Sequence, residues 1–132
     1  MSTLDIGSME SFGFENDPIV IRADFRGIEG GKVLNVDDYN EEWIRAGQLI
    51  IRESGVEDPE YKPLGVENGS YQALPNGYEY AGICRATKPK TEPFVAIMTW
   101  GEVNDIASPY PITAALKATL KTALPHISFE HD

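Results

Sequence analysis

The side chains best suited to chemistry are one cysteine and two histidines. Cys84 lies within a run of apolar residues, and His126 and His131 lie close to the C-terminus. A cysteine nucleophile needs a neighbouring base, and a zinc site needs several nitrogen or sulfur ligands. The chain has no HxH, HExxH or GxSxG spacing. We therefore expect Cys84 to be a small buried hydrophobe, and we expect no metal or other cofactor.

Two other segments have compositions that occur in ligand sites. The carboxylates of Asp37–Glu42 could hold a hard cation such as Ca²⁺, but the spacing of an EF-hand is absent, which favours a solvated turn. Gly27, Gly30 and Gly31 precede residues that read as a strand, whereas a phosphate loop precedes a helix. Two carboxylates that meet only in space would permit acid–base catalysis, yet no pair stands out. We expect a protein that is not an enzyme.

The acidic net charge argues against two classes of partner, nucleic acids and anionic membranes. The chain of 132 residues has 21 acidic and 11 basic residues, for a formal net charge of −10. Such a chain repels phosphate backbones and anionic lipid surfaces, so we expect neither nucleic acid nor membrane as a partner. The sequence has no long apolar run and no basic, apolar leader, so we expect no transmembrane helix or signal peptide and synthesis in a cytoplasm.

Two apolar strands are at the centre of the elements that must position any site. Tyr78–Ala86 and Pro93–Val103 are rich in β-forming residues, and the polar segment Thr87–Glu92 predicts a turn between them. Strict alternation would place Phe94, Ala96, Met98 and Trp100 on one side of the second strand and Val95, Ile97 and Thr99 on the other. Gly82 and Gly101 indicate a bulge, a bend or a close backbone approach.

The remaining pattern predicts a mainly β domain over residues 18–132 with one C-terminal amphipathic helix. Apolar residues recur every four positions, and Pro125 stops the predicted helix; they are Ile112, Leu116, Leu120 and Leu124. Further strands are expected at Pro18–Phe25, Lys32–Val36, Ala46–Glu53, Gly69–Leu74 and Ile127–Phe129, with a long loop over residues 54–68. A small sandwich or barrel-like domain fits this series.

Residues 1–17 predict an N-terminal arm that is extended or disordered in the free protein. Its apolar residues follow neither a helical nor a strand period among Gly, Ser and acidic residues; they are Leu4, Ile6, Met9, Phe12 and Phe14. Three alternatives stay open for this arm. It docks on a neighbouring subunit and orders on contact, it folds back on its own domain, or it is a loose terminus.

Several short patterns occur in a characteristic order. They are Arg45–Ile50, Lys62–Val66, Tyr78–Ile83, Gly101–Asn104, a Tyr-Pro-Ile-Thr approach to the helix at Tyr110–Thr113, and Leu124–Phe129. This series, over roughly residues 45–129, resembles the small head decoration and head fiber proteins of tailed phages. The resemblance implies a virion protein with a small β-rich, β-tulip-like fold on the capsid exterior, often trimeric near three-fold positions. Catalytic residues and cofactors are not implied.

The resemblance also implies a partner and a contact segment. The major capsid protein is the expected partner, a homotrimer the expected oligomer, and the virion the expected location. An arm that clamps the shell makes the apolar residues of the N-terminal segment the capsid-contact candidates; they are Leu4, Ile6, Met9, Phe12 and Phe14. The alternative from another class is a β domain that binds a small ligand or glycan through stacking aromatics; they are Trp43, Tyr61, Tyr71, Tyr78, Tyr80 and Trp100.

Overall fold

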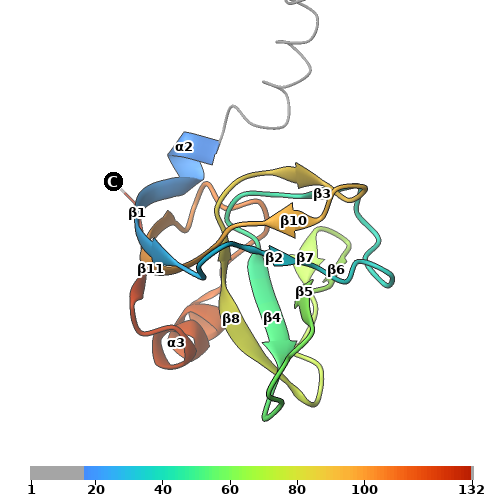
Figure 1. Cartoon of the computed structure of the whole chain (residues 1–132). Helices are drawn as coiled ribbons and strands as arrows, with labels where there is room; N and C mark the ends of the chain where they lie inside the picture. Colours follow the sequence, from blue (N-terminus) through green and yellow to red (C-terminus); the bar gives the residue numbers. More distant parts are fainter. Residues whose placement is uncertain (1–16, 132) are drawn as a thin grey trace, which may run out of the picture.

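The chain folds into short strands around one six-stranded sheet, with a helix near the C-terminus (Figure 1). The computed structural model describes residues 17–131. The helices are α2 (Asp17–Val20) and α3 (Ala114–Ala123). The strands are β1 (Ile21–Gly27), β2 (Lys32–Val33), β3 (Trp43–Ile44), β4 (Leu49–Glu53), β5 (Tyr61–Pro63), β6 (Val66–Glu67), β7 (Ser70–Tyr71), β8 (Tyr78–Cys84), β9 (Lys88–Pro89), β10 (Phe94–Val95), β11 (Ile97–Asn104) and β12 (Ile127–Glu130). The predicted mainly β fold with a C-terminal helix is confirmed.

Strand β11 is the centre of the main sheet, whose order is β1-β11-β8-β4-β5. Met98 is paired with Gly27 of β1 and with Ile83 of β8, so these two strands lie on opposite edges of β11. The second half of β11 pairs with β12 in parallel, from Gly101↔Ile127 onward. Strand β11 therefore pairs with strands from both ends of the described chain, β1 and β12.

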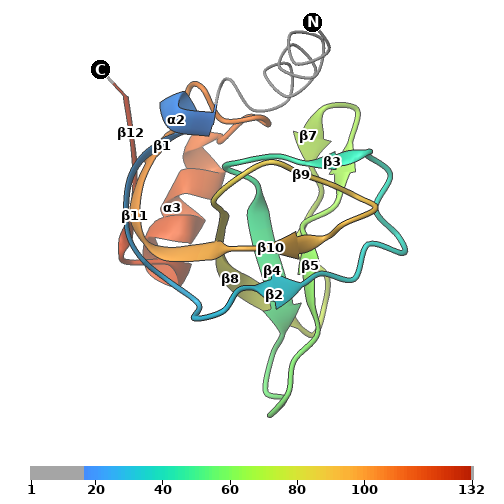
Figure 2. The ribbon, with the colours of Figure 1, turned by 45° about the horizontal axis from the view of Figure 1, so that its top comes forward.

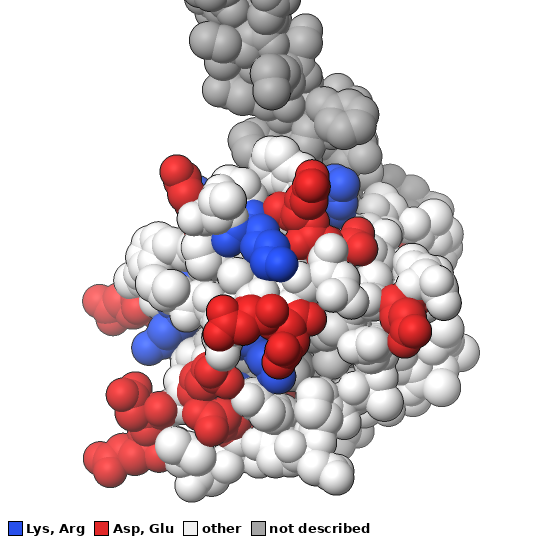
Figure 3. All heavy atoms as spheres, turned by 90° about the vertical axis from the view of Figure 1, so that its right-hand side faces the viewer, with Lys and Arg blue, Asp and Glu red and all other residues white. Residues whose placement is uncertain are grey.

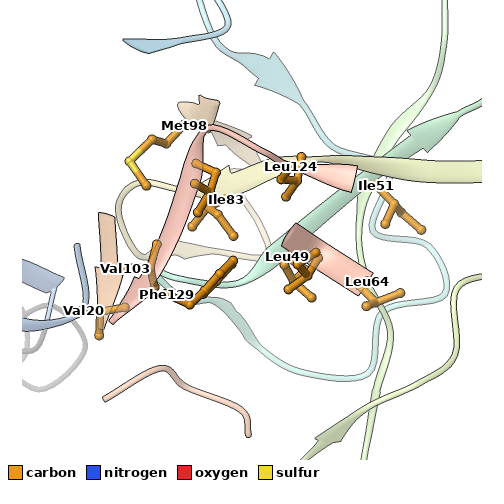
Figure 4. Close-up of a cluster of buried hydrophobic side chains, with 11 residues drawn as sticks. Val20, Leu49, Ile51, Leu64, Ile83, Met98, Val103, Leu124 and Phe129 are labelled. Carbon is orange, nitrogen blue, oxygen red and sulfur yellow. The ribbon is translucent and has the colours of Figure 1, made fainter. Parts of the chain in front are cut away.

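Both faces of the sheet are covered by apolar residues. Leu49 and Ile51 of β4 lie in a first layer with Leu120 of α3, whereas Ile50 between them lies in a second layer. Figure 4 shows the first layer, to which β4, β8, β11, α3 and β12 contribute. The second layer includes residues from β3, β5 and β10, and Figure 2 shows β2 and β10 crossing in front of β4. The helix covers the face of Leu49 and Ile51.

The sequence of α3 explains its length and orientation. Thr113 is its N-cap, and its hydroxyl accepts a hydrogen bond from the Leu116 backbone nitrogen at 3.2 Å. Leu120 and Leu124 are buried, while Leu116 is half-buried, and Pro125 follows the helix as expected. The predicted apolar stripe is therefore confirmed, and it packs on the sheet.

The strand predicted at Pro18–Phe25 begins only at Ile21. Asp17–Val20 forms one helical turn instead, with Pro18 at its start, where the missing N–H costs nothing. The Asp17 carboxylate accepts hydrogen bonds from the backbone nitrogen of Thr87 at 2.9 Å and from its hydroxyl at 2.7 Å. This pair of bonds fixes the point where the described chain begins.

Two predicted connections contain strands. Lys88–Pro89, within the predicted turn, forms β9 and pairs with β3. The predicted loop over residues 54–68 contains β5, which is the end strand of the main sheet, and β6. Pro63 lies in β5 and Pro89 in β9, and proline weakens a strand prediction, whereas β6 is only two residues long.

The alternation expected for the strand at Pro93–Val103 holds for Ile97 and Met98, which lie in opposite layers, but the single buried face expected for this strand is wrong. The segment is divided into β10 and β11, and both Ile97 and Met98 are fully buried, in the second and the first layer respectively. Phe94 and Trp100, expected to point the same way as Met98, are 54% and 47% exposed. The expectation failed because a strand covered on both faces buries consecutive residues.

Of the alternatives given for Gly82 and Gly101, a bulge, a bend or a close backbone approach, the structure shows a close backbone approach at both. A Cβ atom on Gly82 would lie 2.5 Å from the Met98 carbonyl oxygen, and one on Gly101 would overlap the carbonyl oxygen of Ala23 and the Met98 side chain. Neither glycine is needed for an unusual φ angle, because neither has a positive one. Both are needed because backbone lies where a side chain would begin.

We predict that Gly101→Ala lowers the free energy of unfolding by about 1–3 kcal/mol, because β1 or Met98 must move to admit the methyl group. Urea unfolding followed by far-UV circular dichroism measures the change. Ser128→Thr is the matched control, since it adds one methyl group at an exposed position of the adjacent strand β12. Equal stability of the two variants would contradict the close approach.

Asp105 ties the end of β11 to the helix and to the C-terminal segment. Its carboxylate accepts from Lys117 Nζ at 2.5 Å and lies 2.8 Å from His131 Nδ1. The Asp105 side chain is only 8% exposed. The hydrogen bond from Lys117, followed by that from His131, lowers the pKa of Asp105 to about 2.

We predict that Asp105→Asn lowers the free energy of unfolding by about 1–2 kcal/mol at neutral pH, a value reduced for solvent screening of the half-exposed partners. The folded-state pKa lies below the unfolded value of 3.8, so the contribution is present above about pH 4 and disappears as the pH falls through about 2. Urea unfolding at several pH values measures this. Exposed Asp58→Asn is the control, and a difference that persisted at pH 2 would contradict the mechanism.

Candidate protein-binding surface

The most exposed aromatic residues of the main sheet form one surface cluster. Phe25 is 68% exposed and Trp100 is 47% exposed, and their ring centroids are 5.8 Å apart. The Arg26 guanidinium lies 5.7 Å from the Trp100 ring centroid, and the centroid of the His126 ring lies 6.1 Å from it. These four residues are called the aromatic strip below. Contiguous exposed rings on a folded domain indicate an interaction surface.

Strand irregularity positions the aromatic strip. Arg26 is the partner of Trp100, and the register between β1 and β11 shifts on both sides of this pair. Such bulges re-aim side chains, so Phe25 is exposed although the regular alternation from Ile21 predicts the buried side. The His126 carbonyl accepts from the Gly101 backbone nitrogen at 3.1 Å, which holds the His126 turn beside Trp100.

The aromatic strip lies at one edge of the main sheet. Strand β1 is the end strand, and among residues 17–131 no strand pairs with its outer side. At the opposite end, the Tyr61 carbonyl of β5 accepts from the Asn35 backbone nitrogen at 2.8 Å, so that edge is partly covered. Of the two end strands β1 and β5, β1 therefore has the more accessible outer side.

Charge distinguishes the strip from other parts of the surface. Arg26 belongs to it, and two ion pairs border it, Arg22 with Glu102 at 3.4 Å and Arg85 with Asp24. Figure 3 shows a different face, the right-hand side of Figure 1, on which carboxylates predominate. Strands β1 and β11 lie on the left in Figure 1, away from this acidic face.

A second exposed apolar pair lies on the two-stranded sheet formed by β2, which follows β1 in the chain, and β10, which precedes β11. Val33 of β2 and Phe94 of β10 are direct cross-strand partners, and they are 68% and 54% exposed. Their contact provides some mutual shielding, but most of the surface of both side chains faces solvent. Apolar residues thus lie on the surface of both antiparallel pairs, β1–β11 and β2–β10.

The candidate chemical residues do not meet. Cys84 is fully buried in the second layer, and burial raises the pKa of its thiol to about 12. His126 lies beside Trp100 on the surface, and His131 contacts Asp105. The prediction of a buried, apolar Cys84 is confirmed. Within residues 17–131, no group of three His, Cys, Asp or Glu side chains is placed to hold a metal ion.

The other segments considered for ligands are surface turns. The carboxylates of Asp37, Asp38, Glu41 and Glu42 are exposed, as expected for a solvated turn. Gly30–Gly31 leads into β2, so the described loop has no helix N-terminus to face a phosphate.

The six aromatics considered for stacking on a ligand do not form one site. Tyr61 is buried, and Tyr71 packs edge-on against Tyr110 with ring centroids 5.2 Å apart. The Tyr78 hydroxyl donates to Glu60 Oε2 at 2.8 Å, which raises the pKa of Tyr78 to about 12. Of the six, only Trp100 is classed with the exposed large side chains.

Sequence reasoning missed Phe25 and Arg26 and included Trp100 only as one of six aromatics. The available signal was the alternation of charge with apolar residues in IRADFR, which is typical of a strand with one solvated face. The register shifts that turn Phe25 outward have no sequence signature in a single chain. The five capsid-contact candidates lie outside the described residues; they are Leu4, Ile6, Met9, Phe12 and Phe14.

We predict that Cys84 does not react with a thiol reagent in the native protein, because it is fully buried and its thiolate is disfavoured. Labelling with dithionitrobenzoate should proceed only at the rate of unfolding and become fast in urea. Ser54→Cys, at an exposed turn, provides the matched reactive control. Rapid native labelling of the unsubstituted chain would contradict the burial.

No helix within residues 17–131 has the length and apolar character required to cross a membrane. Comparison of the chain with protein-family models, with curated proteins and with solved structures gives no match. The case for a function therefore depends on the residues and geometry described above.

Proposed function

We propose that this chain is a structural virion protein that binds the outer surface of a tailed-phage capsid and stabilises or decorates it. The observation that carries the proposal is the aromatic strip, an exposed aromatic surface on a domain whose other large apolar groups are mostly enclosed in two layers. Its partner is the major capsid protein, and its own oligomer is a trimer.

The order of the short patterns supports this proposal through their structural positions. Tyr78–Ile83 lies in β8 and Gly101–Asn104 in β11, the strands that pair at the centre of the sheet. Leu124–Phe129 connects α3 to β12 and returns the chain to β11. The residues that carry the resemblance are thus the ones that determine the core of this domain.

The composition of the surface suits repeated binding without chemistry. A net charge of −10 favours solubility and discourages non-specific self-adhesion, while apolar side chains on the strip and in residues 1–16 supply contact area. Weak contacts of this kind become strong when several linked copies bind a regular lattice at once. A decorating protein needs this avidity and no active site.

We predict that the full-length protein co-sediments with phage heads that lack it, in a saturable and fixed ratio. A version that starts at Asp17 tests the contribution of the N-terminal segment and keeps the carboxylate that binds Thr87. Phe25→Ser combined with Trp100→Ser tests the strip. Val56→Ser is the matched control, because Val56 is 48% exposed on the β4–β5 connection.

Loss of binding in the version starting at Asp17 identifies the segment as the clamp, and loss in the strip variant identifies the strip as a contact. Retention of binding by both would exclude both surfaces. Failure of the full-length protein to pellet would reject the capsid role. The glycan alternative would then be tested by thermal shift, with Trp100 as the stacking residue.

A further inference from the structure

We propose that in the free protein the aromatic strip is the docking site of the chain's own N-terminal segment, residues 1–16, with Phe12 and Phe14 against Phe25 and Trp100. This inference concerns the free protein and stands without the capsid role. Only a later transfer of the segment to a capsid rests on the proposed function.

The first argument is proximity. Asp17 is held by Thr87, and the single turn of α2 leads directly into β1. Phe25 lies four residues into β1, so the path from Asp17 to Phe25 is about 19 Å at most, given the usual rise per residue of helix and strand. Phe14 and Phe12 precede Asp17 by three and five positions, so their Cα atoms can lie up to about 10 Å and 17 Å from that of Asp17, and each ring extends further toward the strip. The segment therefore reaches the strip of its own domain.

The second argument is chemical complementarity. Phe12 and Phe14 are separated by one residue, so both rings can lie on the same side of an extended segment. Phe25 and Trp100 are half-exposed or more, which leaves ring surface free for edge-to-face or offset contacts. Two rings on the segment match two rings on the strip.

The third argument is charge. Residues 1–16 contain Asp5, Glu10 and Glu15 and no lysine or arginine. An acidic segment is repelled by the face that Figure 3 shows, on which carboxylates predominate. The strip carries Arg26, whereas the bordering arginines Arg22 and Arg85 are paired with Glu102 and Asp24, so Arg26 supplies the positive charge of this surface. Electrostatics thus disfavours that acidic face for the segment and favours the strip.

The tether favours the chain's own segment over that of a second copy. Contact with a second copy requires two chains of formal net charge −10 to associate, which costs free energy even where the proposed trimer forms. A segment tethered at Asp17 has a high effective concentration at the nearby strip. The occupant is therefore the segment of the same chain.

The test measures the accessibility of Trp100 in the full-length protein. The chain has two tryptophans, so Trp43→Phe leaves Trp100 as the only one. Acrylamide quenching is compared between this protein and the same protein with Phe12→Ser and Phe14→Ser. We expect the double substitution to increase quenching and to shift the Trp100 emission to the red. Thermal unfolding of each variant checks that the domain is folded.

Two controls make the result specific. Leu4→Ser with Ile6→Ser removes two apolar side chains further from Asp17, and its effect on quenching should be smaller. Val56→Ser removes a similarly exposed apolar side chain from the β4–β5 connection and should have no effect. Unchanged quenching in the Phe12 and Phe14 variant would overturn the proposal. Protection of Trp100 that disappears on dilution, together with an oligomeric mass by sedimentation, would overturn it in favour of the segment of a second copy.

Discussion

The fold depends on the contact of backbone with backbone along β11. This strand pairs with β1, β8 and β12, and at Gly82 and Gly101 the neighbouring carbonyl oxygens lie where a side chain would begin. Removing the side chains at these points lets three strands converge on one. Because β1 and β12 come from opposite ends of the described chain, the two glycines determine whether both ends can join the sheet.

A sheet covered on both faces must also accommodate polar groups in one of its layers. Gln48 is fully buried, and its side chain accepts from the Tyr39 hydroxyl at 2.6 Å and donates to the Leu64 carbonyl at 3.0 Å. These bonds join the 34–44 segment to β4 and to the residue after β5. Each compensates for desolvation that would otherwise cost stability, and their geometry fixes how the short β segments lie on the sheet. Helix α3 covers its face of the sheet with leucines, and its polar tie to the sheet, Lys117 to Asp105, lies at the edge of this face.

Sequence reasoning succeeded where a pattern reflects a local cause. The stripe ending at Leu124 predicted α3 because helical spacing alone places these residues on one face, and Gly82 and Gly101 predicted close approaches because glycine in an apolar strand has few other uses. It failed where the cause is tertiary. The burial of both Ile97 and Met98 depends on cover from distant segments, and the outward turn of Phe25 depends on a register shift against β11.

The register shifts between β1 and β11 explain both why sequence reasoning missed Phe25 and where the candidate site lies. A regular β1 would direct Phe25 to the side of Ile21, and Trp100 would stand alone, as an isolated exposed aromatic with no particular meaning. The bulges beside Arg26 bring a second ring and a cation to Trp100, on the more accessible edge of the main sheet. Bulges at sheet edges commonly discourage pairing with other chains, because they break the regular row of backbone donors and acceptors. Here the same irregularity weakens backbone pairing at β1 while it assembles a side-chain surface, so binding at this edge depends on rings and charge more than on strand addition.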